Sequence, residues 1–524
     1  MAINKDTLIG VLSVIGGILI HFTFGHFYTI GNLAPYMMSY LKIRVDPNVE
    51  MGSAVWISAI ALSMQGVSMP IGGALLPFMG YRAVVILGCI INSGSILLTY
   101  FTIQKGFIYV VLTYAVALGF GFGFSYAIIF SVAGSWFPKR RALITGMIVG
   151  GFGLGALVFT PIQTVYINPN NLMVNNETKL FDDPELLDKV PMAFLILGGS
   201  LAALQFIGIF LLIEKTEPKK TTKSETENQE DKNEMRSLVH GDAEKNAAKT
   251  TAQGEVEDEE MMAIIGTRRS ISIAHSSIGP ISPPKRGKVS IVVPEEINYP
   301  PLQCLRRHEF YFLWIIMLCN IIPITLITAS FKLVGQMHIP NDRFLSGVAT
   351  ASSLFNSGGR IMWGAICDKF SFKGPLTMML TTWAILLFTF PYIVQIKTGS
   401  MVVYTIWVCL LFLCLSGNFV LMPGATSRIF GPDYMAVNYG MVFTGFSVGS
   451  IVCAIISERL KGHWTLLYGM CGCICLFALF MLMWVVDPFT SKRFNFSKPC
   501  TNVLQRLQPR VPILPKEEDE NVTA

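Results

Sequence analysis

The chain contains 524 residues, of which 52% are hydrophobic and 14% are charged, whereas ordinary globular domains carry roughly 25% charged residues. The formal net charge is +6 at pH 7. The charged residues are concentrated, because residues 214–307 hold 31 of the 74 and the other 430 residues hold 43. Surfaces so poor in charge aggregate in water but are expected in lipid, which excludes a soluble enzyme. No basic stripe with interleaved aromatic residues occurs, so no nucleic-acid partner is expected.

Apolar stretches of the length that a membrane helix needs, about 20 residues, recur along the whole chain. Six precede the charged segment and six follow it. In chain order they cover about 8–33, 53–76, 84–103, 107–133, 142–166 and 191–213, then 310–333, 344–367, 375–395, 401–423, 437–457 and 464–486. We therefore predict an all-α membrane protein of twelve transmembrane helices, with one six-helix half at 1–213 and a second at 308–487. The first stretch is too long for a cleavable signal, so we interpret it as a retained span.

The segment at 214–307 and the tail at 488–524 are polar. The segment contains GEVEDEE and ISPPKRGK, and its low hydrophobicity cannot offset the entropy lost on ordering. We expect a disordered cytoplasmic linker and a cytoplasmic tail. Within the linker, Arg268-Arg269 precedes Ser270 and Ser272, which is a possible phosphorylation pattern for a basophilic kinase; an unmodified basic patch explains it equally well.

A short motif recurs after the second and the eighth stretches. The sequence GALLPFMGYR at 73–82 is followed, 291 positions later, by GAICDKFSFK at 364–373. The first copy has Pro77 where the second has Asp368, and the second has Ser371 where the first has Gly80. This motif and the six-plus-six layout resemble the major facilitator superfamily, whose members contain two repeated halves. The resemblance covers nearly all of the chain outside the linker and tails, and it implies a secondary transporter with both termini and the linker in the cytoplasm.

Charge and glycosylation patterns agree with that orientation. Basic clusters at 139–141 and 306–307 fall on the predicted cytoplasmic side, as the positive-inside rule requires. Asn176 begins an Asn-Glu-Thr sequon in the loop after the fifth stretch, which this topology puts outside, so we expect glycosylation there. No organelle address is legible. The plasma membrane is the default location, and an organelle membrane stays open.

Arg360 is the candidate residue on which the predicted function depends. It lies eight residues before Asp368, about 12 Å along a helix, which is near the middle of a hydrocarbon core about 30 Å thick. A permanent cation there needs an anionic partner or water, and no acidic residue lies deep in any stretch. A substrate carboxylate, held by two parallel hydrogen bonds, is the simplest partner. The alternative is a structural arginine bonded to helix carbonyls or directed toward Asp368.

Three further segments resemble the oxalate–formate exchanger and monocarboxylate porter branches of the superfamily. They are NSGGRIMWG at 356–364, GFGFGFSY at 119–126 and NYGMVFTGFS at 438–447. The resemblance implies that Arg360 holds a carboxylate. Asn356 stands where many monocarboxylate porters have an aspartate, and Phe446 stands where the oxalate carrier has a lysine. A single central cation favours a monocarboxylate of the pyruvate, lactate or formate type over oxalate.

Tyr126, His21 and His26 complete the candidate residues. Tyr126 lies about 15 Å along a helix from Trp136, at a depth close to that of Arg360, where a phenol could orient a carboxylate or simply pack. The histidines are deep groups that can titrate near neutral pH; proton coupling and structural hydrogen bonding are both open for them.

The sequence thus predicts a carrier of a small organic anion that works by alternating access, with a proton or an exchanged anion as the coupled species. A carrier for another solute, such as an amino acid or a drug, and a nutrient sensor that signals through the linker are the alternatives. The 11 cysteines show no CxxC spacing of the kind found in zinc sites, so we expect no metal and no cofactor.

Overall fold

The computed structural model describes residues 5–49, 53–170, 172, 180–215, 298–339, 342–396, 400–460 and 462–488. The predicted glycosylation site Asn176 and the predicted phosphorylation sites Ser270 and Ser272 lie outside these residues. Everything below concerns the described residues.

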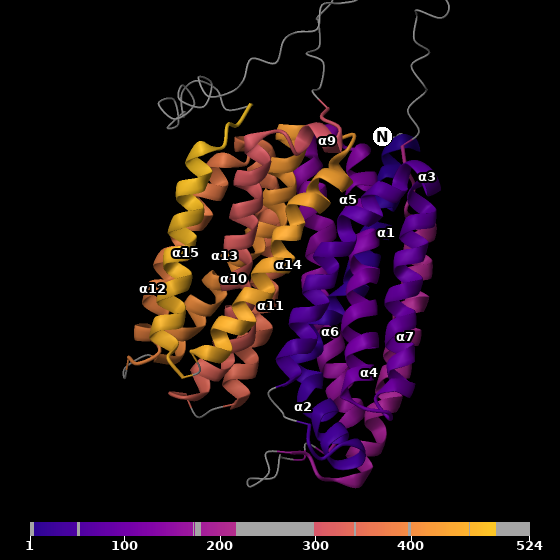
Figure 1. The fold of residues 1–524 in the computed structure, drawn as a ribbon, viewed down its shortest axis with the longest axis vertical. Coiled ribbons are helices and arrows are strands. Elements are labelled where there is room, and N and C mark those ends of the chain that lie inside the picture. Colours follow the sequence, from indigo (N-terminus) through magenta and orange to yellow (C-terminus); the bar gives the residue numbers. More distant parts are fainter. Residues whose placement is uncertain are drawn as a thin grey trace, which may run out of the picture. The chain divides into compact units, whose positions relative to one another are not determined.

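Helices make up both parts of the chain (Figure 1). The first part contains α1 (Lys5–Phe24), a 3₁₀ segment (Gly25–Thr29), α2 (Ile30–Tyr40), α3 (Ala54–Thr102), α4 (Phe107–Val111), α5 (Leu118–Ser135), α6 (Arg141–Ile167) and α7 (Pro184–Leu211). The second contains α9 (Pro301–Cys304), α10 (His308–Gln336), α11 (Asp342–Phe370), α12 (Lys373–Ile393), α13 (Ser400–Phe430), α14 (Met435–Arg459) and α15 (Trp464–Trp484). The prediction of an all-helical membrane protein is confirmed.

Ten stretches of the described chain are long and apolar enough to cross a membrane. They correspond to the twelve predicted spans with two differences. The 49 residues of α3 contain the second and third spans, which turn at Gly80, where φ is 74° and ψ is 161°. The helix α11 matches the eighth span but is not among the ten. Its serines, Asn356 and Arg360 lower its mean hydropathy, which is typical of a helix that faces other helices rather than lipid.

The first span is longer than the sequence pattern indicates. It continues past the predicted end near residue 33 through α2 and a π-helical turn to Val45. Pro35 does not end the helix, because a proline removes only one hydrogen bond and its neighbours can compensate inside a helical bundle. The 3₁₀ segment divides this span at the level of His26.

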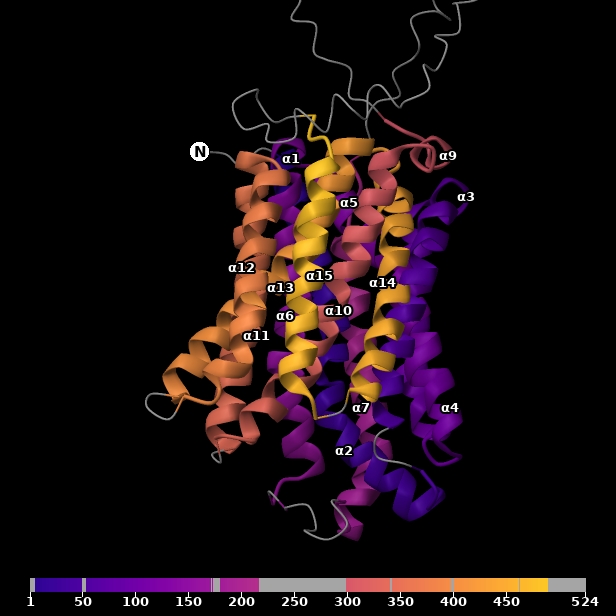
Figure 2. The same ribbon diagram turned by 60° about the vertical axis from the view of Figure 1, so that its left-hand side comes forward.

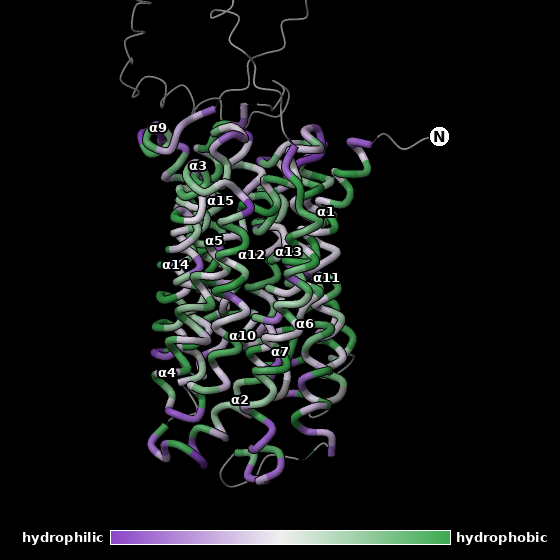
Figure 3. Tube along the Cα trace, turned by 90° about the vertical axis from the view of Figure 1, so that its right-hand side faces the viewer, coloured by the Kyte–Doolittle hydropathy of each residue, from purple (hydrophilic) through white to green (hydrophobic). Residues whose placement is uncertain are grey.

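The most extensive contacts between the two parts of the chain are those of α6 with α11 and of α3 with α14; α13 also contacts α6, and α14 contacts α5. Within the first part α1 contacts α6 and α7, and within the second α11 contacts α13 and α12 contacts α15. Figures 1 and 2 show the start of α1 and α9 at one end of these helices and α2 toward the other. Hydrophobic residues predominate along the middle of the helices, and hydrophilic residues gather toward both ends (Figure 3).

The structure supports the repeat seen in the sequence. Gly80 and Ser371, which the offset of 291 makes equivalent, both have left-handed backbone conformations, with φ of 74° and 64°. Among the residues described, Ser371 is the only non-glycine residue with positive φ. In the second copy, Asp368 accepts hydrogen bonds from the backbone N–H groups of Ala142 at 3.1 Å and Leu143 at 2.8 Å. Its carboxylate therefore caps the N-terminus of α6 and joins the two halves, a contact that Pro77 cannot make in the first copy.

The glycines of α6 lie on two close-packing faces. A Cβ atom at Gly146 would collide with the carbonyl oxygen of Arg360, and one at Gly153 would collide with the Ser357 hydroxyl. On the other face, a Cβ at Gly151 would lie 2.7 Å from the Ile18 carbonyl oxygen. Small residues allow α6 to approach α11 and α1 this closely, and this approach positions the Arg360 side chain.

Candidate substrate site around Arg360

Arg360 lies on α11 at the contact with α6, with 1% of its surface exposed. Its Nε donates to Asn356 Oδ1 at 3.1 Å, one turn earlier on the same helix. Its Nη1 donates to the Val149 carbonyl oxygen of α6 at 2.6 Å, and its Nη2 to the Tyr28 hydroxyl oxygen at 3.4 Å. The guanidinium thus bonds to both halves of the chain.

No carboxylate of the described residues is found in an ion pair with Arg360. Asp368, considered above as a partner for Arg360, caps α6 instead. The helix-carbonyl alternative is partly correct, because Val149 supplies a carbonyl, but that carbonyl belongs to the opposite half. A buried guanidinium with three neutral partners keeps its full positive charge uncompensated.

Aromatic rings surround this cation. The guanidinium carbon lies 4.7 Å from the centroid of the Phe419 ring and 5.7 Å from that of Phe152. Cation–π attraction of this kind is worth about 2 kcal/mol when desolvated, well below what pairing with an anion gives in an apolar interior. The rings hold the guanidinium in place without neutralising it.

Tyr126 and Phe446, predicted from the sequence, belong to the same group of side chains. The Phe152 ring lies 6.1 Å from the Tyr126 ring between centroids, and the Tyr126 ring lies 6.2 Å from that of Phe443. Phe443 stacks on Phe446 at 4.5 Å with an interplanar angle of 13°. Phe446 lies 6.1 Å from Phe419, which returns to the guanidinium. The six residues of this closed circuit, called the Arg360 cluster below, are Arg360, Phe152, Tyr126, Phe443, Phe446 and Phe419.

The two histidines have similar bonding and different surroundings. His21 Nδ1 lies 3.2 Å from the Gly17 carbonyl oxygen, and His26 Nδ1 lies 2.7 Å from that of Thr23. The His21 ring packs 4.9 Å from the Tyr126 ring, whereas His26 packs against Tyr114 and Phe122. The structure therefore brings His21 to the Arg360 cluster, and no ring contact links His26 to any of the six residues in the described part of the chain.

Sequence reasoning missed several residues of the site. Tyr28, Val149, Phe152 and Phe419 all contact Arg360, and Tyr439 packs 5.6 Å from Phe443. The glycine-rich face of the fifth span was the available signal for α6, since a helix that approaches so closely presents its backbone carbonyls to its neighbour. Nothing in the sequence distinguishes Phe419 or Tyr28 from packing residues.

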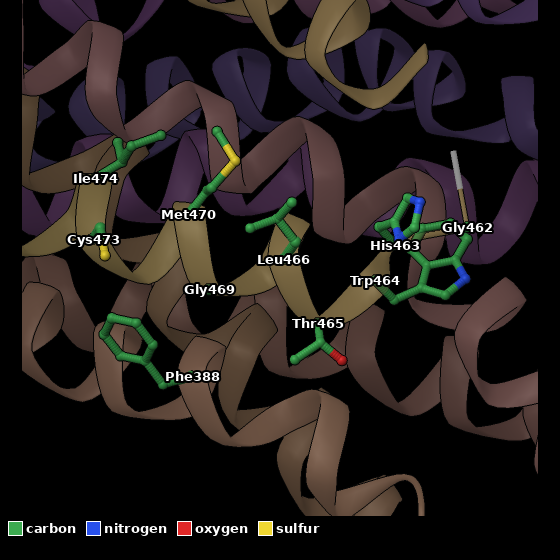
Figure 4. A pocket seen from close by; sticks show the side chains of 10 residues that line it. All are labelled: Phe388, Gly462, His463, Trp464, Thr465, Leu466, Gly469, Met470, Cys473 and Ile474. Atoms are coloured by element: carbon green, nitrogen blue, oxygen red, sulfur yellow. The ribbon is translucent and has the colours of Figure 1, made fainter. Parts of the chain in front are cut away.

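A groove lies elsewhere in the described part of the chain. It has a volume of about 840 Å³ and runs along α15 beside Phe388 of α12 (Figure 4). Its lining includes Leu466, Met470 and Ile474, with His463 and Thr465 near the start of α15. It shares no residue with the Arg360 cluster, and no permanently charged side chain lines it. The groove therefore lacks the permanent cation that a site for an anion would need.

Comparison with known proteins agrees with this architecture. The model of the Major Facilitator Superfamily matches residues 15–454. The chain is 26% identical to the apicoplast pyruvate carrier 1 of Toxoplasma gondii, over 93% of this chain and 91% of that protein. It is 25% identical to the oxalate:formate antiporter of Oxalobacter formigenes, over 32% of this chain and 40% of that one. These matches confirm the predicted resemblance to that branch.

The fold is similar to a solved structure of the proton:xylose symporter XylE, with a TM-score of 0.60 and 12% identity over 92% of this chain and 97% of the other. At this identity the likeness concerns the fold alone. Together with the sequence match, it shows that the chain belongs to the Major Facilitator Superfamily and is an integral multi-pass membrane protein, a secondary transporter of small solutes and not an enzyme.

Proposed function

We propose that this transporter moves a small monocarboxylate, of the pyruvate, lactate or formate type, across its membrane by alternating access. The observation that carries the proposal is the burial of Arg360 at the contact between the halves, with neutral partners only among the described residues. A buried cation without a counter-ion is costly. A carboxylate that enters from water supplies the missing negative charge. The attraction between this charge and the buried guanidinium provides the binding energy.

The hydrogen-bond count of the guanidinium supports a single carboxylate. An arginine has five N–H donors, and three are used by Asn356, Val149 and Tyr28. Two remain, which is the number that a carboxylate accepts in the bidentate arrangement. Asn356 acts as a positioning residue here, because its bond to Nε orients the plane of the guanidinium.

The surroundings of the guanidinium set the number of charges that the site accepts. In our proposal Phe446 walls the site where a second cation would be needed for a dicarboxylate, and its stacking on Phe443 fills that space with apolar surface. Tyr126 presents a ring and a hydroxyl at the opposite side of the circuit. The similarity to a protein named as a pyruvate carrier over nearly the full length of both chains supports the same substrate class.

The bonds that cross between the halves support alternating access. The Val149 and Tyr28 bonds connect Arg360 to the first half, and the Asp368 cap connects α11 to the start of α6. A carboxylate bound to Arg360 neutralises the guanidinium and weakens its hydrogen bond to the Val149 carbonyl. The helices α6 and α11 can then move apart. We favour exchange or facilitated movement over proton symport, since none of the described carboxylates is bonded to Arg360; His21 and His26 are the groups for the proton-coupled alternative.

Uptake by purified protein in liposomes tests the proposal. Labelled lactate, pyruvate, formate and oxalate are compared with and without a pH gradient and with and without internal anion. We expect saturable uptake of at least one monocarboxylate, loss of that uptake in Arg360→Gln, and weak uptake of oxalate. Saturable oxalate uptake without response to monocarboxylates would overturn the assignment, as would full activity of Arg360→Gln.

The location of the protein stays a separate proposal. The plasma membrane is the default, and glycosylation at Asn176 would support it. Labelling of intact cells with an impermeant reagent, followed by removal of N-linked glycans, tests both points together.

A further inference from the structure

The last ten residues of the linker, 298–307, pack against the helices, although the sequence predicts a disordered segment there. They include α9 and lead directly into α10 at His308. Cys304 in this stretch is 0% exposed, and the Arg307 guanidinium carbon lies 5.2 Å from the centroid of the Tyr299 ring. Residues 298–307 are therefore an ordered element of the fold, called the strap below.

Three hydrogen bonds join the strap to the corner between α13 and α14. The Tyr299 N–H donates to the Phe430 carbonyl oxygen, at the end of α13, at 2.8 Å. The Asp433 N–H, in the loop after α13, donates to Asn298 Oδ1 at 3.2 Å. Asn438 Nδ2, in the first turn of α14, donates to the Tyr299 carbonyl oxygen at 3.0 Å. The strap thus ties together the end of one helix, the loop and the start of the next helix.

The start of α14 is also a place where the second half of the chain meets α3 of the first. A Cβ atom at Gly73 would lie 2.7 Å from the Val437 backbone nitrogen, and one at Gly440 would lie 2.7 Å from that of Pro70. Asn438, which binds the strap, lies between these two contacts along the helix. The transporter can open at the end of the helices where α10 begins, called the linker end below, only if this part of α14 leaves α3.

The loop between α13 and α14 has the features of a hinge. It consists of residues 431–434, and Gly431 has a left-handed backbone with φ of 89°. Hinges are short loops or helix ends of this kind, whose few residues absorb changes in φ and ψ. The strap binds before, within and after this loop. The loop therefore cannot change its conformation freely while the strap is bound.

We infer that the strap regulates opening of the transporter: bound to the corner, it holds the start of α14 against α3, and its release lets the linker end open. The linker thereby acts on the transport cycle through residues 298–307. The inference concerns the movement of helices and holds for any cargo, so it goes beyond the proposed function.

Cysteine labelling of the full-length protein in the absence of cargo measures both parts of this inference. Cys304 reports on the strap, because burial raises the pKa of its thiol to about 12, whereas a cysteine in water has a pKa of about 8.5 and reacts faster. Ala436→Cys reports on the contact with α3, since Ala436 is 4% exposed beside Gly73. A water-soluble maleimide is added, and peptide mass spectrometry gives the labelling rate at each position.

Two variants remove one bond of the strap each. Asn298→Ala removes the acceptor in the loop, and Asn438→Leu removes the donor on α14. The loss of one such hydrogen bond shifts an equilibrium about fivefold. We therefore expect both variants to label about fivefold faster than the unaltered strap, at Cys304 and at Ala436→Cys alike.

Thr389→Val is the matched control. It removes the hydrogen bond that Trp407 of α13 donates to Thr389 of α12 at 2.9 Å, which lies within the same half. Both labelling rates should stay within about twofold of the unaltered protein. Labelling at Cys89, which is buried in α3, reports on general unfolding and should stay slow in every variant.

Coupling between the strap and the linker end must act in both directions. Asp368→Asn weakens the cap on α6, at the other extensive contact between the halves, and leaves every residue of the strap unchanged. If the strap is released when the linker end opens, this variant should also label faster at Cys304. It tests the inference even where Asn438→Leu folds poorly.

The outcomes separate regulation from simple packing. Faster labelling at Cys304 with an unchanged rate at Ala436→Cys, in both strap variants, would show that the strap moves without affecting α14 and would overturn the inference. Unchanged rates at both positions would overturn it too. So would an Asp368→Asn protein that labels faster at Ala436→Cys and keeps the original rate at Cys304.

Discussion

Replacing Arg360 by lysine and by glutamine tests the carboxylate site in graded steps. Lysine keeps the charge but not the planar fork, and glutamine keeps neither. The two N–H groups that Asn356, Val149 and Tyr28 leave free would each contribute about 1.5–3 kcal/mol as hydrogen bonds to a charged group. We expect lysine to cost about 2 kcal/mol of binding, or roughly 30-fold, and glutamine about 3–4 kcal/mol, or roughly 150- to 1000-fold.

Equilibrium binding of a labelled monocarboxylate to detergent-purified protein is the assay, because it measures affinity separately from the rate of transport. Arg44→Gln is the control, since Arg44 is exposed and pairs with Asp188 at 3.0 Å, and exposed ion pairs contribute little. Thermal unfolding reports on folding of each variant. Wild-type affinity in Arg360→Gln, or an equal loss in Arg44→Gln, would refute the reasoning.

Four further changes test the cap on α6, the repeat, the close packing of α6 and the charge of the site. Asp368→Asn weakens the cap on α6 by about 1–2 kcal/mol and should speed cysteine labelling at that end of the helices; unchanged labelling would contradict the role of the cap. Ser371→Gly relieves a left-handed backbone with φ of 64° and should stabilise the protein by about 0.5–1 kcal/mol in thermal unfolding, whereas a lower midpoint would argue against strain. Gly146→Ala should reduce uptake at least several-fold because its Cβ meets the opposite helix, while Gly199→Ala, which faces open space, should transport normally; equal behaviour of the pair would show that close packing is not required. Phe446→Lys adds a second cation and should raise the affinity for oxalate about tenfold or more relative to monocarboxylates, and an unchanged oxalate-to-lactate ratio would remove Phe446 from the account of specificity.

The arrangement of spans could be predicted from the sequence because a bilayer imposes a fixed length of apolar residues on each helix. The boundaries of the spans were harder to predict. The sequence separates the second and third spans at 77–83, whereas in the structure both belong to α3 and meet at the turn at Gly80. Residues that face other helices lower the hydropathy of α11, so its apolar pattern is weaker than that of the other spans.

Residues of the site could be predicted from the sequence only where their type is unusual in a membrane helix. Arg360 stands out because a permanent charge is rare in a membrane helix. Tyr28 and Phe419 do not, since aromatic residues are common there, and periodicity does not say which face of a span meets the other half of the chain. The role of Val149 was hidden for a simpler reason: it acts through its backbone carbonyl, which every residue has.

A structure of the protein with a bound monocarboxylate tests the central claim most directly. We predict that the carboxylate lies within hydrogen-bond distance of both Nη atoms of Arg360, inside the circuit of aromatic rings of the Arg360 cluster. A carboxylate bound in the groove along α15, or an Arg360 that is paired with an acidic side chain of the protein, would contradict it.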